Sequence, residues 1–296
     1  FLIPLILSDK KHIVVTGANG QLGMEFQTLA KQFTGYHFLF AAREELSIDD
    51  INSVQKYFAD HVIHVCINCA AYTAVDKAET EKEQAIAINA TAVGNLAAIC
   101  KTNNAVFFHF STDYVFNGHA SKAYIETDAT DPVNFYGQTK LLGETAAIEN
   151  NDKSIIIRTS WVYSMHGKNF VKTMLRLMKE KESIAVVVDQ FGCPTYAADL
   201  AEAVMKIIDD NKFVPGIFHY CNEGIISWYD FATAINELSA SSCVVNAIPT
   251  AAYPTPAARP HYSALDTQKI KNQFGLIIPN WKKSLQDCIE GINSIK

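Results

Sequence analysis

Short apolar runs alternate with longer, helix-patterned segments along the first 220 residues of the chain. The runs are rich in β-branched and aromatic residues, and apolar positions at helical spacing follow most of them. This alternation predicts βαβ units, and therefore a parallel sheet covered by helices. The predicted strands are residues 12–16, 36–41, 62–67, 105–110, 154–159 and 216–220.

The helix-patterned segments predict where the chain returns across the sheet. Between the third and fourth strands, apolar side chains recur three and four positions apart, which is typical of the buried stripe of a helix of about five turns. That stripe is Ala85, Ile88, Ala92, Leu96 and Ile99. Farther on, we expect a helix over 169–181, a strand over 184–188, a helix over 197–209 and an ordered, proline-rich loop over 249–260.

These elements together predict an α/β fold. We expect a Rossmann-type doubly wound parallel sheet with a smaller, interleaved C-terminal substrate lobe. The nucleotide-binding domain is predicted to cover residues 11–162, with returning elements near 195–221. The substrate-binding lobe is predicted to comprise residues 163–194 and 222–296.

A glycine-rich turn follows the first predicted strand and opens a helix. It reads Gly17-Ala18-Asn19-Gly20-Gln21-Leu22-Gly23, a G-x-x-G-x-x-G spacing. Glycines at such a turn bring backbone N–H groups close to a pyrophosphate and let the helix N-terminus face the phosphates. Its position between the first strand and the first helix of an α/β chain favours a dinucleotide site.

The end of the second predicted strand bears on the choice of cofactor. An acid there binds the ribose 2′-hydroxyl, whereas an arginine accommodates a 2′-phosphate. This chain has Ala42 and Arg43 at that point, with Glu44 beyond. We therefore expect NADPH to be preferred over NADH, although NADH remains open. The alternative is that Arg43 is a solvated loop residue.

Tyr136 and Lys140 are the strongest candidates for catalysis. Four positions apart on a helix, they lie one turn from each other on one face. Since a nearby cation favours the phenolate, we expect the Tyr136 pKa to fall from about 10 toward neutrality. Thr112 follows the C-terminal end of the fourth predicted strand, where ligands collect in open α/β sheets.

Composition narrows the class of protein. The chain has 296 residues, 49% of them hydrophobic, and a formal net charge of −6, so no nucleic-acid or anionic-membrane partner is expected. No apolar run reaches the roughly 20 residues of a membrane span. The apolar residues 1–7 lack the features of a secretory signal, and we expect a cytoplasmic protein.

Cysteine and acidic residues give no metal site. The chain has seven cysteines, and we expect them to be reduced thiols. Cys66 and Cys69 form a C-x-x-C pair in a predicted strand, but no second pair follows at metal-site spacing. The acidic run at 79–83 is most simply a solvated helix face. No bound metal is predicted.

Seven motifs in combination resemble the extended short-chain dehydrogenase/reductases over essentially the whole chain from about His12. Within that superfamily the chain is most similar to the dTDP-4-dehydrorhamnose reductases. The motifs are GANGQLG from 17, NCAAYTAVDKAE from 68, STDYVF from 111, YGQTK from 136, RTSWVY from 158, DQFGCPT from 189 and YPTPAARP from 253.

The resemblance implies NADPH-dependent reduction of the C4 keto group of dTDP-4-dehydro-L-rhamnose to dTDP-L-rhamnose. It implies that Tyr136 donates the proton, that Lys140 binds the nicotinamide ribose, and that Thr112 stands in place of the more usual Ser. The cofactor-binding residues implied are Gly17, Gly20, Gln21, Leu22, Gly23, Arg43, Ser47, Ile48, Ala71, Tyr72, Thr73, Tyr136 and Lys140.

For the substrate, the resemblance implies contacts from Thr112, Asp113 and Trp161. Candidates for the nucleotide end are Asn169, Gln190 and Arg259. The chain departs from the family at Tyr72, where His is frequent, and at Ser47, where Asp is common. Both departures weaken the inference that Tyr72 and Ser47 contact the cofactor as their counterparts do in the family.

Two other readings stay open. One is another sugar-nucleotide enzyme of the superfamily, such as an epimerase or a 4,6-dehydratase. Dehydration needs an Asp-Glu pair where this chain has Asp113-Tyr114, which argues against a dehydratase. The other is a non-catalytic regulatory subunit resembling that of methionine adenosyltransferase. The expected ligand is a small nucleotide sugar, and a homodimer is left open.

Overall fold

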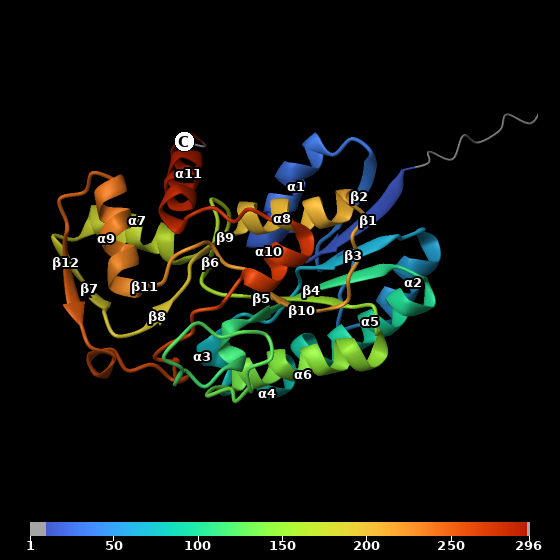
Figure 1. Ribbon diagram of the computed structural model, residues 1–296, viewed down its shortest axis with the longest axis horizontal. Helices are drawn as coiled ribbons and strands as arrows, with labels where there is room; N and C mark the ends of the chain where they lie inside the picture. Colours follow the sequence, from blue (N-terminus) through green and yellow to red (C-terminus); the bar gives the residue numbers. More distant parts are fainter. Residues whose placement is uncertain (1–9, 295–296) are drawn as a thin grey trace, which may run out of the picture.

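A parallel sheet of six strands forms the centre of the molecule (Figure 1). The structure is a computed structural model that describes residues 10–294, so the apolar residues 1–7 lie outside it. The strand order across the sheet is β10-β5-β4-β3-β1-β2. The strands are β1 (Lys11–Thr16), β2 (Tyr36–Ala41), β3 (Val65–Asn68), β4 (Val106–Thr112), β5 (Ile155–Thr159) and β10 (Gly216–His219).

Each of the six predicted apolar runs contributes one strand, so the predicted parallel sheet is confirmed. The inner strands β3 and β5 are buried along their whole length, as expected where helices cover both faces of a parallel sheet. The chain passes from β1 to β2 on one side and then to β3 on the other. This change of direction opens a crevice at the carboxyl ends of β1 and β3.

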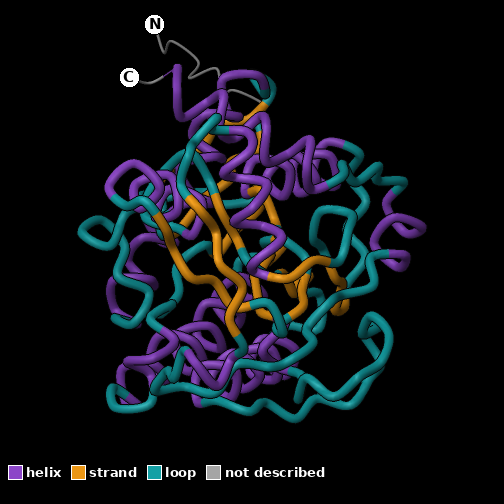
Figure 2. Tube along the Cα trace, turned by 90° about the vertical axis from the view of Figure 1, so that its left-hand side faces the viewer, coloured by secondary structure: helices purple, strands orange, loops and turns teal. Residues whose placement is uncertain are grey.

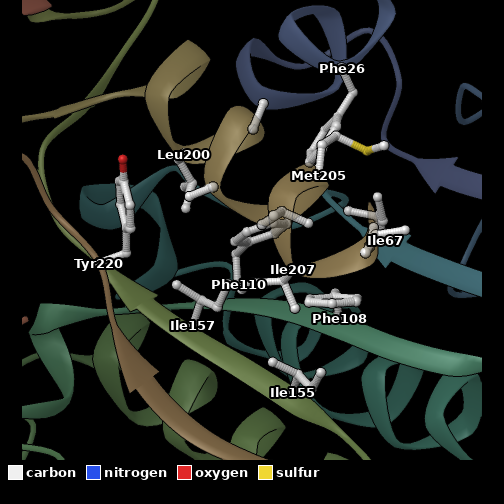
Figure 3. Close-up of a cluster of buried hydrophobic side chains, with 14 of the residues drawn as sticks. Phe26, Ile67, Phe108, Phe110, Ile155, Ile157, Leu200, Met205, Ile207 and Tyr220 are labelled. Carbon is white, nitrogen blue, oxygen red and sulfur yellow. The ribbon is translucent and has the colours of Figure 1, made fainter. Parts of the chain in front are cut away.

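Helices cover both faces of the sheet. On one face, α1 (Gln21–Leu29), α8 (Ala197–Asp209) and α10 (Gln268–Phe274) pack against side chains such as Ile67, Phe108 and Ile157 (Figure 3). The other face is covered by α2 (Ile51–Asp60), α5 (Ala92–Thr102) and α6 (Phe135–Asn150). The predicted doubly wound architecture is therefore confirmed.

The predicted helix around Ala92 is longer than five turns and contains an irregular segment. It begins as α4 (Lys82–Ile86), continues through one π-helical stretch over Ala87–Thr91 and joins α5. Over Lys82–Thr102 it is long and apolar enough to cross a membrane by length and composition alone. Half of its most apolar window is buried within the protein, and it packs against α6, so it is a core helix.

A second group of elements lies beside the sheet (Figures 1 and 2). The predicted helix over 197–209 is α8, which covers the sheet as described above. In the second group, the predicted helix over 169–181 is α7 (Phe170–Glu180) and the predicted strand over 184–188 is β7 (Ser183–Val187). The other elements of this group are β6 (Val162–Tyr163), β8 (Phe191–Gly192), β9 (Thr195–Tyr196), β11 (Ile226–Ser227), α9 (Trp228–Leu238), β12 (Val244–Ile248) and α11 (Trp281–Ser294).

The second group has its own apolar core. Phe231 and Ile235 of α9, Leu285 of α11 and Val171 of α7 are fully buried in it. β7 and β12 pair in parallel to form a small sheet at its outer side. The remaining short elements are α3 (Val75–Ala78) and the 3-10 turns Ala30–Gln32, Asp113–Val115 and Thr250–Ala252. The domain limits given above stay a prediction.

Candidate active site

The glycine-rich turn has the geometry of a phosphate-binding loop. Gly17 has φ +61°, and a Cβ there would lie 2.7 Å from the backbone of Ala70 at the end of β3. A Cβ on Gly23 would lie 2.5 Å from the Gly17 carbonyl oxygen, so α1 approaches the turn closely only because Gly23 has no side chain. Gly20 caps α1, and its N–H donates to Gly17 O at 2.9 Å.

A cleft of about 300 Å³ opens beside this turn at the carboxyl ends of β1, β2 and β3. Six of the predicted cofactor residues line it: Gly17, Gly20, Arg43, Ser47, Ile48 and Ala71. Seven residues that were not predicted to bind the cofactor complete the lining, among them Asn19, Leu46, Asp49 and Ile88. The cleft suits a flat, partly apolar group such as an adenosine.

Arg43 is exposed at the rim of this cleft. Its Nη2 lies 3.2 Å from Asp49 Oδ2, and its side chain is 65% exposed. Ser47 Oγ donates to the other oxygen of the same carboxylate. The guanidinium thus lies at the rim of the cleft, but it is already paired with the Asp49 carboxylate.

The other predicted cofactor residues do not line this cleft. Gln21 and Leu22 open α1, and Leu22 packs against the core of the sheet. Thr73 is exposed, whereas Tyr72 is buried. The Tyr72 hydroxyl donates to Glu81 Oε2 at 2.7 Å, so an internal contact occupies the polar end of this side chain.

Thr112, Asp113 and Tyr136 meet where β4 ends. The Thr112 hydroxyl accepts from Tyr114 N–H and donates to Asp113 Oδ1 at 3.0 Å, which caps the 3-10 turn that follows the strand. Tyr136 lies in the first turn of α6, whose N-cap Asn134 accepts from Gly137 N–H. The Tyr114 ring packs edge-on against the Tyr136 ring. Two hydroxyls and a carboxyl group are therefore brought together from β4 and α6.

Lys140 is on the same face of α6 as Tyr136, as predicted, but its side chain runs into the sheet. Its Nζ donates to the Phe110 carbonyl oxygen at 2.7 Å and lies 3.4 Å from His109 Nε2. The residue is 2% exposed. Burial lowers the pKa of Lys140 to about 8, while the Glu144 carboxylate opposes that shift.

The prediction that Lys140 depresses the Tyr136 pKa is wrong for this structure. Burial raises the pKa of Tyr136 above its usual value, and the Asp113 charge adds to the rise. A hydrogen bond with Thr112 acts in the opposite direction. Proximity along the helix did not place the ammonium against the phenol, because Nζ bonds to β4 instead. Tyr136 is consequently a neutral phenol that keeps its proton.

Asp113 is the most perturbed carboxyl group at this edge of the sheet. It is 2% exposed, and its Oδ2 has no hydrogen-bond partner within the described residues. Burial raises the pKa of Asp113 to about 7, although hydrogen bonds from Ser263 and Thr112 lower it. The neighbouring Ser111 hydroxyl is also buried and without a partner among residues 10–294. Unpaired polar atoms of this kind suit a site that receives a polar ligand.

Trp161 has a strained backbone and a stacked ring. Its φ of +46° is unusual for a residue other than glycine. Its indole stacks on Trp228 with centroids 3.6 Å apart, and a Cβ on Gly192 would lie 2.8 Å from the indole. Backbone strain is found at many functional sites, but a tryptophan packed in this way can equally serve the core, so the role of Trp161 in the sugar site stays a prediction.

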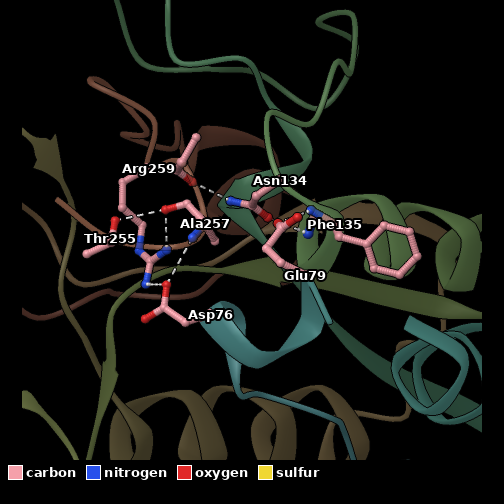
Figure 4. A network of polar contacts seen from close by, with 9 residues as sticks. Asp76, Glu79, Asn134, Phe135, Thr255, Ala257 and Arg259 are labelled. Carbon is pink, nitrogen blue, oxygen red and sulfur yellow. Dashed lines mark hydrogen bonds and ion pairs between the residues drawn. The ribbon is translucent and has the colours of Figure 1, made fainter. Parts of the chain in front are cut away.

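Arg259 fastens the proline-rich stretch to the rest of the molecule (Figure 4). Its Nη2 lies 2.9 Å from Asp76 Oδ1 of α3, and its Nη1 donates to the Ala257 carbonyl oxygen. Asn134, which caps α6, donates through Nδ2 to the Ala258 carbonyl oxygen at 2.8 Å. The predicted ordered loop is thus tied to the helix that carries Tyr136.

Asn169 and Gln190 also have partners within the protein. Asn169 caps α7, and its Nδ2 donates to Gln21 Oε1 of α1 and to the Ser164 carbonyl oxygen. Gln190 is 9% exposed, and its Nε2 donates to Thr250 Oγ1. These contacts give Asn169 a structural function, joining α7 to the start of α1, that the sequence reading missed.

Sequence reasoning also missed a buried polar layer behind Lys140. His109, Asn68 and Thr16 lie on adjacent strands on the face that α5 and α6 cover. Arg158 of β5 forms a buried bidentate ion pair with Glu144 of α6. The available signal was a histidine between two phenylalanines in an otherwise apolar strand.

Known proteins that are similar over almost the whole chain include several dTDP-4-dehydrorhamnose reductases. A family model described as the RmlD substrate binding domain matches residues 11–294. The dTDP-4-dehydrorhamnose reductase of Escherichia coli (strain K12) is 46% identical over 92% of this chain and 94% of its own length.

Two solved structures agree with that match. The dTDP-4-dehydrorhamnose reductase of Clostridium acetobutylicum has a TM-score of 0.92 and 41% identity, covering 95% of this chain and 99% of its own. The one from Bacillus anthracis, in complex with NADP, has a TM-score of 0.91 and 38% identity over the same shares of the two chains. By sequence over almost its whole length, and by its fold, this chain belongs to the family of the dTDP-4-dehydrorhamnose reductases.

Proposed function

We propose that this chain, a member of a family of NAD(P)H-dependent oxidoreductases, reduces the C4 keto group of dTDP-4-dehydro-L-rhamnose to dTDP-L-rhamnose with NADPH. The observation that carries the proposal is the meeting of the Thr112 hydroxyl, the Tyr136 phenol and the Asp113 carboxyl at the carboxyl end of β4. That edge also holds the glycine-rich turn and the cleft beside it.

The residues around the cleft fit a dinucleotide. Gly17 lets the turn pass close to the Ala70 backbone, and the first N–H groups of α1 have no partner within the helix and can meet a phosphate. Ser47, Ile48 and Ala71 would hold the adenosine end, and Arg43 would meet a 2′-phosphate after leaving Asp49. The bound NADPH supplies the hydride.

Tyr136 is the proposed proton donor. Its raised pKa keeps the phenol protonated across the physiological range, so the proton is present when an alkoxide develops at the sugar C4. Thr112, whose hydroxyl is near enough to the phenol to affect its pKa, would orient the carbonyl oxygen toward it. Both hydroxyls lie on regular elements, β4 and α6, which keeps their separation constant.

Lys140 has the role of a fixed positive charge near the reacting centre. With a pKa of about 8 it is mainly an ammonium at pH 7, and its position is set by the Phe110 carbonyl. From this position the ammonium would bind the nicotinamide ribose of the cofactor. Asp113 and Trp161 would contact the sugar, and the lobe formed by 163–194 and 222–296 would hold the nucleotide.

The test is NADPH absorbance followed with dTDP-4-dehydro-6-deoxy sugar as substrate. We expect one NADPH to be oxidised for each sugar reduced, with a higher kcat/KM for NADPH than for NADH. An epimerase would convert the sugar without net loss of NADPH, and a regulatory subunit would leave both unchanged. Either result would contradict the proposal.

A further inference from the structure

A row of buried polar side chains crosses the sheet and ends at Lys140. Thr16, Asn68 and His109 are register partners on the adjacent strands β1, β3 and β4, and each is at most 1% exposed. Thr16 Oγ1 lies 2.7 Å from Asn68 Oδ1, and Asn68 Nδ2 lies 3.1 Å from His109 Nδ1. His109 Nε2 then lies 3.4 Å from Lys140 Nζ.

Apolar side chains occupy the preceding positions of the same strands on the same face. They are Val14, Cys66 and Phe107, all in the core beneath α2 and α5. Polar groups so deep in a core are costly unless each has a hydrogen-bond partner. The row satisfies that condition, but only if its donors and acceptors alternate correctly.

The protonation of Lys140 decides the direction of this alternation. An ammonium only donates, so His109 must accept through Nε2 and carry its proton on Nδ1. The Nδ1–H then needs an acceptor, and the Asn68 carbonyl oxygen is the group within reach once the amide is turned over. The Asn68 amide nitrogen would in turn donate to Thr16 Oγ1. The opposite direction requires a neutral Lys140 amine.

We propose that His109, oriented by Asn68, is a positioning residue for the reduction: its neutral imidazole accepts a hydrogen bond from the Lys140 ammonium and holds Nζ at the carboxyl end of β4. The proposal rests on the proposed function, in which Lys140 acts as a cation. Phe110 O and His109 Nε2 are two acceptors for the three protons of this ammonium.

The electrostatics of the site explain why such an acceptor matters. Burial holds the pKa of His109 well below its usual range, with Lys140 adding to that effect, so the imidazole stays neutral and able to accept. Burial also favours the neutral form of Lys140, while Glu144 on the same helix favours the charged form. The other charged or titratable groups on the elements around α6 include Asp113, Tyr114, Arg158, Asp76 and Glu83.

The tautomer of His109 tests the proposal without any turnover. We would record ¹⁵N NMR spectra of the histidine-labelled protein at pH 7 and assign the His109 signals by their loss in His109→Gln. The expected result is a neutral ring protonated on Nδ1, with Nε2 unprotonated. A ring protonated on Nε2 would overturn the proposal, whether or not the protein reduces the nucleotide sugar.

The pH profile of kcat gives the second readout. A hydrogen bond to the Lys140 ammonium favours the charged form and raises its pKa. His109→Phe removes the acceptor, so the fall of kcat at high pH should begin about one pH unit or more lower. His109→Gln keeps an acceptor, so this basic limb should stay where it is in the wild type. Asn68→Asp, which can only accept, should move the limb upward. His219→Gln, at a buried histidine of β10 that bonds to Tyr124 O, is the matched control and should not move it.

The proposal would be overturned if His109→Phe and His109→Gln lost kcat equally and the basic limb did not move in either variant or in Asn68→Asp. Such a result would show that the row of polar side chains only maintains packing. A wild-type protein that does not oxidise NADPH with the sugar contradicts the proposed function instead. The NMR measurement then still decides whether His109 accepts from Lys140.

Discussion

The glycine-rich turn and the proline-rich stretch are two segments of the proposed site that are held in different ways. The turn is shaped by its own backbone, through Gly17 at positive φ and a Gly20 N–H to Gly17 O bond. The stretch over 249–260 is held by side chains distant in sequence, among them Asp76, Asn134 and Asp189.

This difference separates what local sequence can encode from what tertiary contacts must supply. A turn that depends on glycine conformations forms wherever those glycines occur between a strand and a helix. A loop that depends on Arg259 finding Asp76, 183 positions earlier in the chain, forms only in the complete fold. We therefore expect substitutions that strain the backbone of the glycine-rich turn to impair cofactor binding. Substitutions of the side chains that hold the proline-rich stretch should impair substrate binding.

The largest effect on turnover is expected at Tyr136, which is proposed to act where the cofactor and the substrate meet. Tyr136→Phe removes the proposed proton donor while leaving the ring that packs against Tyr114. We expect kcat to fall by about 10²–10⁴-fold, with cofactor affinity unchanged. Steady-state kinetics together with NADPH fluorescence titration measure both quantities. An unchanged kcat would remove Tyr136 from the role of acid.

Gly17→Ala tests the cofactor side. The new Cβ would stand 2.7 Å from the Ala70 backbone at a φ that costs an L-residue about 1–2 kcal/mol. We expect the KM for NADPH to rise about tenfold or more, and the KM for the sugar to change much less. Gly35→Ala, where a Cβ would meet nothing within 4 Å, is the control. Equal changes in both constants would indicate general unfolding.

Arg259→Ala and Asp76→Asn together test the substrate side. If Arg259 acts by fastening the loop, both variants should raise the KM for the sugar to a similar extent, about fivefold for a partly buried pair worth about 1 kcal/mol. The KM for NADPH should stay nearly constant. A rise in Arg259→Ala alone would show that the guanidinium touches the nucleotide sugar directly.

Arg43→Ala should have a smaller effect, confined to cofactor choice. The exposed guanidinium can favour a 2′-phosphate only after it separates from Asp49. We expect the ratio of kcat/KM for NADPH over NADH to fall about twofold to fourfold. Sugar affinity should not change. A wild-type protein with equal kcat/KM for both cofactors would contradict a role for Arg43 in specificity.

The smallest effect concerns stability and comes from Asp113. Because burial raises its pKa to about 7, the protonated form is favoured in the folded state. Its contribution to stability is fully present below the unfolded pKa of about 4 and is lost as the pH rises through about 7. Asp113→Asn should therefore raise Tm relative to the wild type by about 2 °C or more at pH 8, and less at pH 4. The same gain at both values would contradict this assignment.

The two segments also explain which parts of the molecule could be predicted. Strands such as residues 36–41 follow from β-branched and aromatic runs, and Gly17 follows from the spacing of its motif. The orientation of Lys140 could not be predicted, because its Nζ bonds to Phe110 O on a strand 30 positions away. The contacts of Asn169 and Arg259 were missed for the same reason, since both partners lie far off in the sequence.

Family resemblance suggested residues without giving their surroundings. It pointed to Tyr136 and Lys140, but helix spacing alone gave the wrong direction for the Tyr136 pKa, since burial outweighs the charge of a lysine that faces elsewhere. His109 lies one position from the strand residue that binds Lys140. Its place between two phenylalanines marks it as a buried polar residue, but the local sequence does not give its contact with Lys140.

The most direct test of the account follows one deuterium atom. With NADPH deuterated at the transferable position of its nicotinamide ring and dTDP-4-dehydro-L-rhamnose as substrate, we predict a product that carries one deuterium at the sugar C4, in equal amount to the NADP⁺ formed. Tyr136→Phe should form it at least about a hundredfold more slowly. A product without deuterium, or NADPH that stays unoxidised while the sugar changes, would contradict the account.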